Sequence, residues 1–296
     1  MPVLSIIACG MLEDELAYVL SQDRDLQQLI LVENRECQSL LRKLKAGTCL
    51  PRTAPLDRVP MLLNNGHGTE LRKALNPLHQ LHFFKKLHDK MKIKGARQVT
   101  AVVNVLRLGL HVDLELLKSE VYENIRKMAP FSDGILLFYG TCGNALGKLE
   151  EDFAGFGCPL YFLKDKSGET VEDCISLALG GNEAYAEAML ACRGVGTIYL
   201  TPLWALNWKK MEEEAGGSPD LNKRYLQNSH YGWTAKINTG LPCGPDFHKN
   251  VRDFARSFGM EILEREGSPE VAKRSYEYAR KAVIEKAVSQ ILPQNP

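Results

Sequence analysis

Three cysteines and one histidine hold positions from which their side chains could do chemistry together: Cys9, His111, Cys142 and Cys174. The first three follow shortly after the apolar runs 3–8, 98–105 and 135–139, which are typical of strands buried on both faces. Parallel strands end at one edge of their sheet, where open α/β folds bind ligands. Cys174 follows a polar turn that we place at the same edge. Three thiolates and one imidazole are a known zinc set, and three cysteines can also hold an iron–sulfur cluster.

The stretch 134–147, with the sequence GILLFYGTCGNALG, changes in its middle from a buried strand to a tight polar turn. Glycine adopts backbone conformations that other residues resist, so this turn can be sharp and can let a ligand approach the main chain closely. Polar and aromatic residues also gather beyond the strand that we expect at 196–200. We therefore expect the following residues to bind the ligand: Tyr139, Gly140, Gly143, Asn144, Asp173, Thr201 and Trp204.

The less specific alternative is that these cysteines are buried, unreactive thiols beside unrelated loops. Free cysteine is among the most buried residue types, and the spacing here is unlike that of any zinc finger. A single histidine is more often a packing residue than a ligand, although the junction of strand and helix at His111 favours a function. Acidic residues near the cysteines, such as Glu15 and Asp173, are expected to cap helices, with hydrogen-bond acceptor or proton carrier as the alternative role.

The composition bounds the possible functions. Within 296 residues the chain has 37 basic and 36 acidic side chains, so no overall charge attracts nucleic acid or an anionic membrane. No apolar run approaches the roughly 20 residues that span a bilayer, and the N-terminus lacks the basic region of a secretory signal. Eight scattered cysteines without a CxxC pair argue against a disulfide framework. We expect a cytoplasmic protein.

Runs typical of strands alternate with amphipathic helical patterns along the chain. This alternation predicts an α/β fold with a mostly parallel sheet and helices on both faces, built as one unit or as two intimately packed lobes. We expect a core α/β domain over residues 1–205 and a C-terminal helical extension over 206–296 that completes the same globule. A basic helical insertion near 69–94 carries His79 and His82, whose spacing could clamp a metal. A solvated basic face is favoured there, and the insertion is a candidate dimer contact or lid.

Several short segments carry a resemblance to a known family: Ala8-Cys9-Gly10 with Glu15, Gly109-Leu110-His111, Tyr139-Gly140-Thr141-Cys142-Gly143, Asp173-Cys174-Ile175 with Gly180, Tyr185, and Gly196-Thr197-Ile198-Tyr199. Over about residues 3–205 the chain resembles the uncharacterised family catalogued as domain of unknown function 1638. Members occur in anaerobic archaea and bacteria, often encoded near corrinoid-dependent methyltransferases. The resemblance implies a link to methyl-transfer metabolism, with a corrinoid protein or methyltransferase as partner, and gives no established activity.

Three functions follow from these residues. The first is a metal-site protein that binds zinc or an iron–sulfur cluster through Cys9, Cys142, Cys174 and His111, with metal-dependent methyl transfer as the candidate reaction. The second is a non-catalytic accessory protein that holds a corrinoid, a tetrapyrrole or a metal, with aromatic residues such as Trp208 lining a large pocket. The third is an enzyme with Cys142 as nucleophile near a helix N-terminus and His111 as base.

Overall fold

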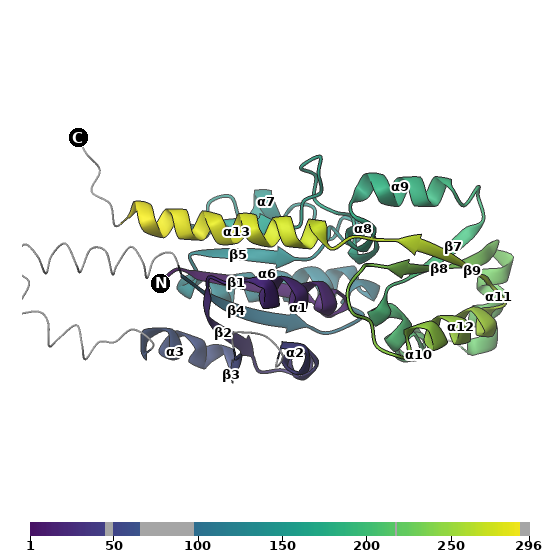
Figure 1. The fold of residues 1–296 in the computed structure, drawn as a ribbon, viewed down its shortest axis with the longest axis horizontal. Helices are drawn as coiled ribbons and strands as arrows, with labels where there is room; N and C mark the ends of the chain where they lie inside the picture. The colour runs from purple at the N-terminus through teal and green to yellow at the C-terminus, as the bar shows by residue number, and fades with distance from the viewer. Residues whose placement is uncertain (45–49, 66–97, 217, 291–296) are drawn as a thin grey trace, which may run out of the picture.

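A computed structural model describes residues 1–44, 50–65, 98–216 and 218–290. It confirms the α/β fold that the sequence predicts, with two sheets whose strands all run parallel within each sheet (Figure 1). The larger sheet has the order β3-β2-β4-β1-β5-β6. Its strands are β1 (Val3–Cys9), β2 (Leu26–Val32), β3 (Arg52–Ala54), β4 (Val99–Leu106), β5 (Gly134–Phe138) and β6 (Leu160–Phe162).

Helices cover both faces of the larger sheet, which explains why its central strands are apolar throughout. Every residue of β4 and of β5 is buried, as expected for parallel strands between two helical layers. One face packs against α1 (Glu13–Gln22), α2 (Cys37–Leu44) and α13 (Glu270–Ser289). The opposite face packs against α3 (Val59–Asn65), α6 (Leu114–Met128) and α7 (Leu149–Asp152).

The smaller sheet, in the order β7-β8-β9, lies beyond the carboxyl ends of the larger sheet's strands (Figure 1). Its strands are β7 (Gly196–Leu200), β8 (Tyr231–Asn238) and β9 (Glu261–Glu266). One face packs against α8 (Cys174–Leu179) and α9 (Asn182–Leu190). The other face packs against α10 (Pro202–Ala215) and α12 (Phe247–Phe258), and α11 (Pro219–Asn228) contacts α12 and β8. Two parallel sheets therefore form two lobes.

The C-terminal part of the chain contributes to both lobes. The expected boundary at 205/206 separates β7 from β8, which pair along their lengths, so the smaller sheet takes strands from both sides of it. Residues 206–296, which the sequence reading describes as a helical extension, also form β8 and β9. Helix α13 then returns to pack on α1 and β5 of the larger sheet. The expected insertion near 69–94 lies outside the described residues.

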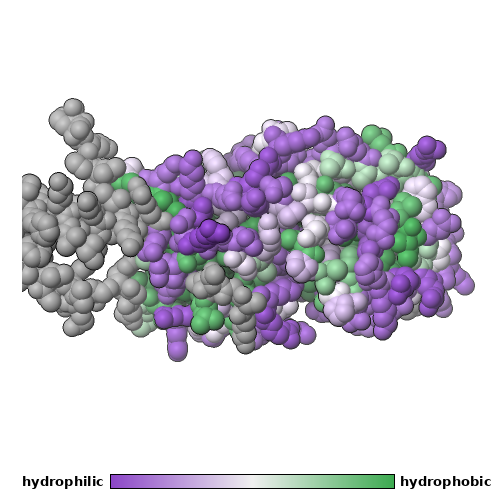
Figure 2. Space-filling view, in the orientation of Figure 1, coloured by the Kyte–Doolittle hydropathy of each residue, from purple (hydrophilic) through white to green (hydrophobic). Residues whose placement is uncertain are grey.

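One face of the molecule shows how polar and apolar side chains are distributed. Figure 2 shows a face on which hydrophilic side chains predominate, with hydrophobic ones more frequent over the smaller lobe. Among the described residues, no helix has the length and apolar character needed to cross a bilayer.

Candidate functional site

The centre of the larger sheet is where the connections between its strands diverge. From β1 the chain runs to β2 on one side of the sheet, whereas from β5 it runs to β6 on the other side. The two strands are direct neighbours, with Ala8 paired to Phe138. Open parallel sheets form ligand crevices at such a divergence, outside the carboxyl ends of the strands. Cys9 is the last residue of β1, and the turn that carries Cys142 follows β5.

The four residues that the sequence singles out line one cavity of about 250 Å³: Cys9, His111, Cys142 and Cys174. Of the expected ligand-binding residues, Tyr139, Gly140, Gly143, Asp173 and Trp204 line the same cavity. Asn144 instead lines a neighbouring polar cavity of about 280 Å³, which shares Tyr139 and Gly140 with the first. Thr201 lies outside both, because its side chain accepts a hydrogen bond from the Trp204 amide (3.4 Å) and so caps α10.

The turn after β5 holds Cys142 in a conformation that L-residues rarely adopt. The backbone φ angles of Cys142, Gly143 and Asn144 are all positive, at 48°, 66° and 67°. The Cys142 amide donates a hydrogen bond to the Glu172 carbonyl (2.7 Å), and this bond helps to hold the turn. A non-glycine residue in this region costs on the order of 1–3 kcal/mol and persists where surrounding structure enforces it, often at functional sites.

Gly140 lines both cavities and also allows a close approach within the protein. A Cβ atom built on it would lie 2.7 Å from the backbone of Asp173 and from the Glu172 carbonyl. Another main-chain segment therefore fills the space that a side chain at this position would need. The close approach brings the segment before Cys174 against the turn that carries Cys142.

Cys174 is the first residue of α8, and a network of side-chain hydrogen bonds fixes it. The Asp173 carboxylate accepts hydrogen bonds from the Ile175 amide (2.9 Å) and the Ser176 amide (2.8 Å), so it caps the helix as expected. The Asn182 side chain accepts from the Glu172 amide (2.9 Å) and from the Ser176 hydroxyl (2.6 Å). Its amide group also donates to the Thr170 carbonyl (3.0 Å).

Sequence reasoning missed the role of Asn182. The only local signal is an asparagine directly after the pair Gly180 and Gly181, both of which have positive φ. Asparagine after glycines marks a turn, but its partners ten and twelve residues away are set by the tertiary fold.

Trp204 connects the smaller lobe to the cysteines. It stands in the first turn of α10, and its indole N–H donates a hydrogen bond to the Cys174 sulfur (3.3 Å). The His111 ring lies 5.7 Å from the Trp204 ring, centre to centre, at an interplanar angle of 50°. Burial lowers the pKa of His111, although the Asp173 carboxylate opposes this shift. A neutral imidazole, which is the form that binds metals, is thereby favoured.

The three thiols raise one another's pKa values. Burial, followed by the charge of Cys142, raises the pKa of Cys9 to about 12. Burial, followed by Cys174 and Asp173, raises the pKa of Cys142 to about 12. The pKa of Cys174 is raised well above its ordinary value by burial and then by Cys9. Without a cation, all three groups are therefore neutral thiols near pH 7.

The raised pKa of the Cys142 thiol does not support this residue as a free nucleophile. The turn does not lead directly into a helix, because α7 begins only at Leu149. No hydrogen bond joins His111 to Cys142 within the described part of the chain, so the expected general base is not hydrogen-bonded to the thiol. A reactive cysteine needs a lowered pKa, whereas that of Cys142 is raised.

A buried carboxyl group of α1 lies near enough to the thiols to shift their pKa values. The two acidic residues before it, Glu13 and Asp14, both bind Lys43, at 2.8 Å and 2.6 Å. Glu15 is only 3% exposed, and burial raises its pKa to about 7. Its charge in turn raises the pKa values of Cys9 and Cys174. Glu15 therefore belongs to the electrostatic environment of the thiols.

A single metal ion and an iron–sulfur cluster require different spacings of the three thiols. Within the described ranges, no three His, Cys, Asp or Glu side chains are placed so that one metal ion could be held. Tetrahedral zinc with bonds of about 2.3 Å requires sulfur atoms about 3.8 Å apart. The cysteines of an iron–sulfur cluster bind different iron atoms and stand further apart. In the described residues the three thiols share a cavity but are not placed to hold a single ion, so zinc would require their side chains to rotate inward.

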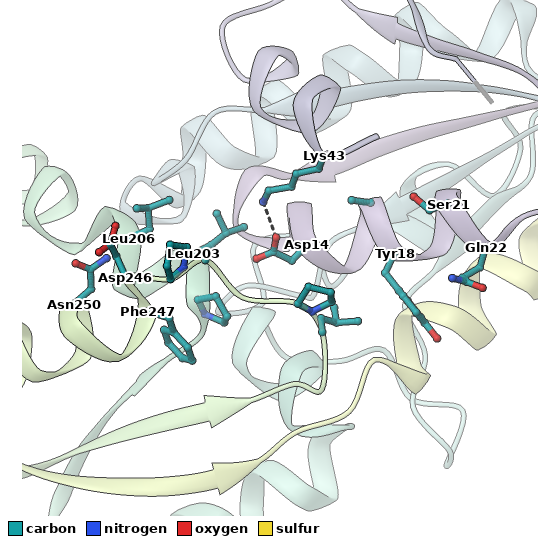
Figure 3. A pocket seen from close by; sticks show the side chains of 16 residues that line it. Asp14, Tyr18, Ser21, Gln22, Lys43, Leu203, Leu206, Asp246, Phe247 and Asn250 are labelled. Atoms are coloured by element: carbon teal, nitrogen blue, oxygen red, sulfur yellow. Dashed lines mark hydrogen bonds and ion pairs between the residues drawn. The ribbon is translucent and has the colours of Figure 1, made fainter. Parts of the chain in front are cut away.

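A larger cleft of about 580 Å³ lies beside the thiol cavity, between the two lobes. Figure 3 shows the paired Asp14 and Lys43 on one side, and Leu203, Leu206 and Asn250 on the other. The first turn of α10 separates the two cavities, because Leu203 lines the cleft and Trp204, the next residue, lines the thiol cavity.

The aromatic residues expected to line an accessory protein's pocket are not those of this cleft, which Tyr18 and Phe247 line instead. The Trp208 ring is buried in the core of the smaller lobe, with Phe254 and Phe258 at ring distances of 5.4 Å and 6.0 Å. Trp204 and Tyr139 line the smaller thiol cavity. The expected aromatic lining of a large pocket is therefore wrong for Trp208, because that ring packs into the core.

The fold and the cavity define an α/β protein with two parallel sheets and a thiol-lined cavity at the carboxyl edge of the larger one. Residues 105–276 match the model of the family described as "Protein of unknown function (DUF1638)", and the chain belongs to this family. The matched region contains His111, Cys142 and Cys174. No curated protein and no solved structure matches the chain.

Proposed function

We propose that the protein binds a thiolate-ligated metal centre, an iron–sulfur cluster or zinc, through Cys9, Cys142 and Cys174, with His111 available as a fourth ligand. The observation that carries this proposal is the convergence of three cysteines, from β1, the turn after β5 and the start of α8, on one cavity. The three segments are distant in sequence, and the fold brings their thiols to the same cavity.

The electrostatics of the cavity supports a cationic occupant. Each thiol raises the pKa of another, so their thiolate forms repel one another in the buried cavity. A bound cation offsets this repulsion and the cost of burying thiolates, and a coordinating thiol loses its proton. The acidic Asp173 and Glu15 raise the thiol pKa values further.

Hydrogen bonds to the sulfur atoms also suit a metal site. Trp204 already donates to Cys174. Donors of this kind orient ligands and adjust the properties of the bound centre.

The bound centre would supply either electron transfer, if it is a cluster, or activation of a thiol substrate, if it is zinc. The protein's own residues would bind that centre, exclude water from it and present it at the wall between the two cavities. The 580 Å³ cleft beside α10 is large enough for an organic substrate. A role in corrinoid-dependent methyl transfer, with a corrinoid protein or methyltransferase as partner, extends this proposal on the strength of the family resemblance.

Anaerobic purification followed by elemental analysis and an absorption spectrum tests the proposal. We expect a stoichiometric centre in the native protein and its loss when Cys9, Cys142 and Cys174 are replaced by alanine together. The matched control replaces Cys37, Cys158 and Cys192, three buried thiols outside the cavity. Equal metal content in the two triple variants would refute the proposal.

A further inference from the structure

Tyr139 carries a buried polar atom that nothing in the described structure satisfies. Its side chain follows β5 directly and is only 2% exposed. The ring packs with the apolar residues between the larger sheet and α6. The hydroxyl group has no hydrogen-bond partner among the described residues. Leaving such a group unsatisfied costs about 1–3 kcal/mol, so its retention calls for an acceptor.

The surroundings of the hydroxyl indicate which acceptor it is. Tyr139 lines the thiol cavity together with Cys9 and Cys142. The hydroxyl lies next to Cys9, and a hydrogen bond between the two side chains contributes to the pKa shift of each, although the pair does not meet strict hydrogen-bond geometry in this structure. A phenolic hydroxyl keeps its proton near neutral pH and acts as a donor. A neutral thiol is a weak acceptor, whereas a thiolate accepts a strong, charge-assisted hydrogen bond.

We propose that Tyr139 is a positioning residue that donates its hydroxyl hydrogen bond to the Cys9 thiolate once the metal centre is bound. This inference rests on the proposed function. It gives Cys9 the kind of donor that Cys174 already has in Trp204. The two donors approach from different lobes, since Tyr139 follows β5 and Trp204 stands in α10.

A hydrogen bond to a ligating sulfur withdraws negative charge from it. In a cluster this favours the reduced state and raises the reduction potential. In a cobalt-substituted zinc site it makes charge transfer from sulfur to metal harder, so the corresponding absorption band moves to higher energy. Neither effect requires Tyr139 to bind the metal itself.

The test compares Tyr139→Phe, which removes only the hydroxyl, with Tyr122→Phe as control. The Tyr122 hydroxyl donates to Asp152, and neither residue lines the thiol cavity. Both variants are purified anaerobically and their metal content is measured. The reduction potential is then measured for a cluster, or the cobalt charge-transfer band for a zinc site.

We expect Tyr139→Phe to keep the full metal content, with a more negative potential or a band at lower energy, and Tyr122→Phe to match the native protein. An unchanged potential or band in fully loaded Tyr139→Phe would overturn the inference while leaving the proposed function intact. Loss of metal from folded Tyr139→Phe would also overturn it, because a tuning donor is not required for binding. A native protein without metal would refute the proposed function first, and this inference with it.

A second measurement does not depend on metal. In metal-free protein the Tyr139 hydroxyl makes no strong hydrogen bond that the variant would remove. Tyr139→Phe should therefore leave the unfolding equilibrium constant unchanged or lower it by up to roughly tenfold. Unfolding that becomes more than tenfold easier would show that the hydroxyl already has a partner in the protein, and would contradict the inference.

Discussion

Glu15→Gln should stabilise the metal-free protein at alkaline pH. Burial raises the pKa of Glu15 from an ordinary value of 4.5 to about 7 in the folded protein. The folded state therefore binds this proton more tightly than the unfolded state does. The contribution of Glu15 to the free energy of unfolding is fully present below about pH 4.5 and is lost as the pH rises through about 7. At 1.36 kcal/mol per pKa unit, the shift is worth about 3 kcal/mol.

Glutamine resembles the protonated carboxyl group and does not titrate. We expect Glu15→Gln and the native protein to have similar free energies of unfolding at pH 4.5, and the variant to be more stable by about 3 kcal/mol at pH 8. The assay is urea unfolding of metal-free protein at several pH values, with the difference between the two proteins plotted against pH. This difference cancels the titration of all other groups.

Glu13→Gln is the matched control on the same helix. Glu13 is also buried, but it binds Lys43 and accepts a hydrogen bond from Ser39, so its replacement should destabilise the protein. If Glu15→Gln were as stable as the native protein, or less stable, at pH 8, then the Glu15 carboxylate would have a favourable partner and the account of its burial would be wrong.

Three further predictions concern the cavity. Gly140→Ala should destabilise the protein by about 1–3 kcal/mol and weaken metal binding at least tenfold, because its Cβ would lie 2.7 Å from the Asp173 backbone. The control Gly155→Ala, whose Cβ would meet nothing within 4 Å, should change stability by no more than about 0.5 kcal/mol. Urea unfolding measures the stability of both variants, and chelator competition measures their metal binding. Asn182→Ala should cost about 1–3 kcal/mol in urea unfolding by leaving the Glu172 amide without an acceptor, and Asn182→Asp, which keeps that acceptor, should recover part of the loss. Apparent metal affinity should rise by up to roughly a thousandfold per pH unit, because the pKa values of all three thiols are raised and each thiol that releases a proton contributes a factor of ten. Chelator competition between pH 6.5 and 7.5 measures this dependence. A rise below tenfold per pH unit would contradict thiolate ligation.

The larger sheet could be predicted from the sequence because its central strands are buried on both faces. A strand between two helical layers must be apolar along its whole length, and the runs at 3–8 and 135–139 fall within β1 and β5 or extend them by one residue. The placement of the candidate residues follows from the same property, since parallel strands present their following residues at one edge. The short β3, with Arg52 and Thr53 exposed, carries no such pattern.

The smaller sheet was harder to predict, because distant residues stabilise its polar positions. Strand β8 buries Lys236, which is only 8% exposed. Its ammonium group lies 3.0 Å from Glu264 of β9 and 5.6 Å from the centre of the Phe247 ring. Both partners come from other segments of the chain. From the sequence alone, a lysine in this run is therefore expected to be exposed, and only the pairing of β8 with β9 explains its burial.

Three of the four candidate residues could be placed for the same reason. Cys9, His111 and Cys142 follow strands of one parallel sheet, which brings them to the same edge. Cys174 depends on hydrogen bonds that Asn182 makes across its loop and on the Trp204 indole of the other lobe. Such contacts join segments that no local pattern relates.

The metal content of anaerobically purified protein tests the central claim most directly. The convergence of Cys9, Cys142 and Cys174 predicts one iron–sulfur cluster or one zinc ion per chain, which is lost when these three cysteines are replaced by alanine and retained when Cys37, Cys158 and Cys192 are replaced instead. A native protein that contains no stoichiometric metal and acquires none on anaerobic reconstitution with iron and sulfide or with zinc would contradict it.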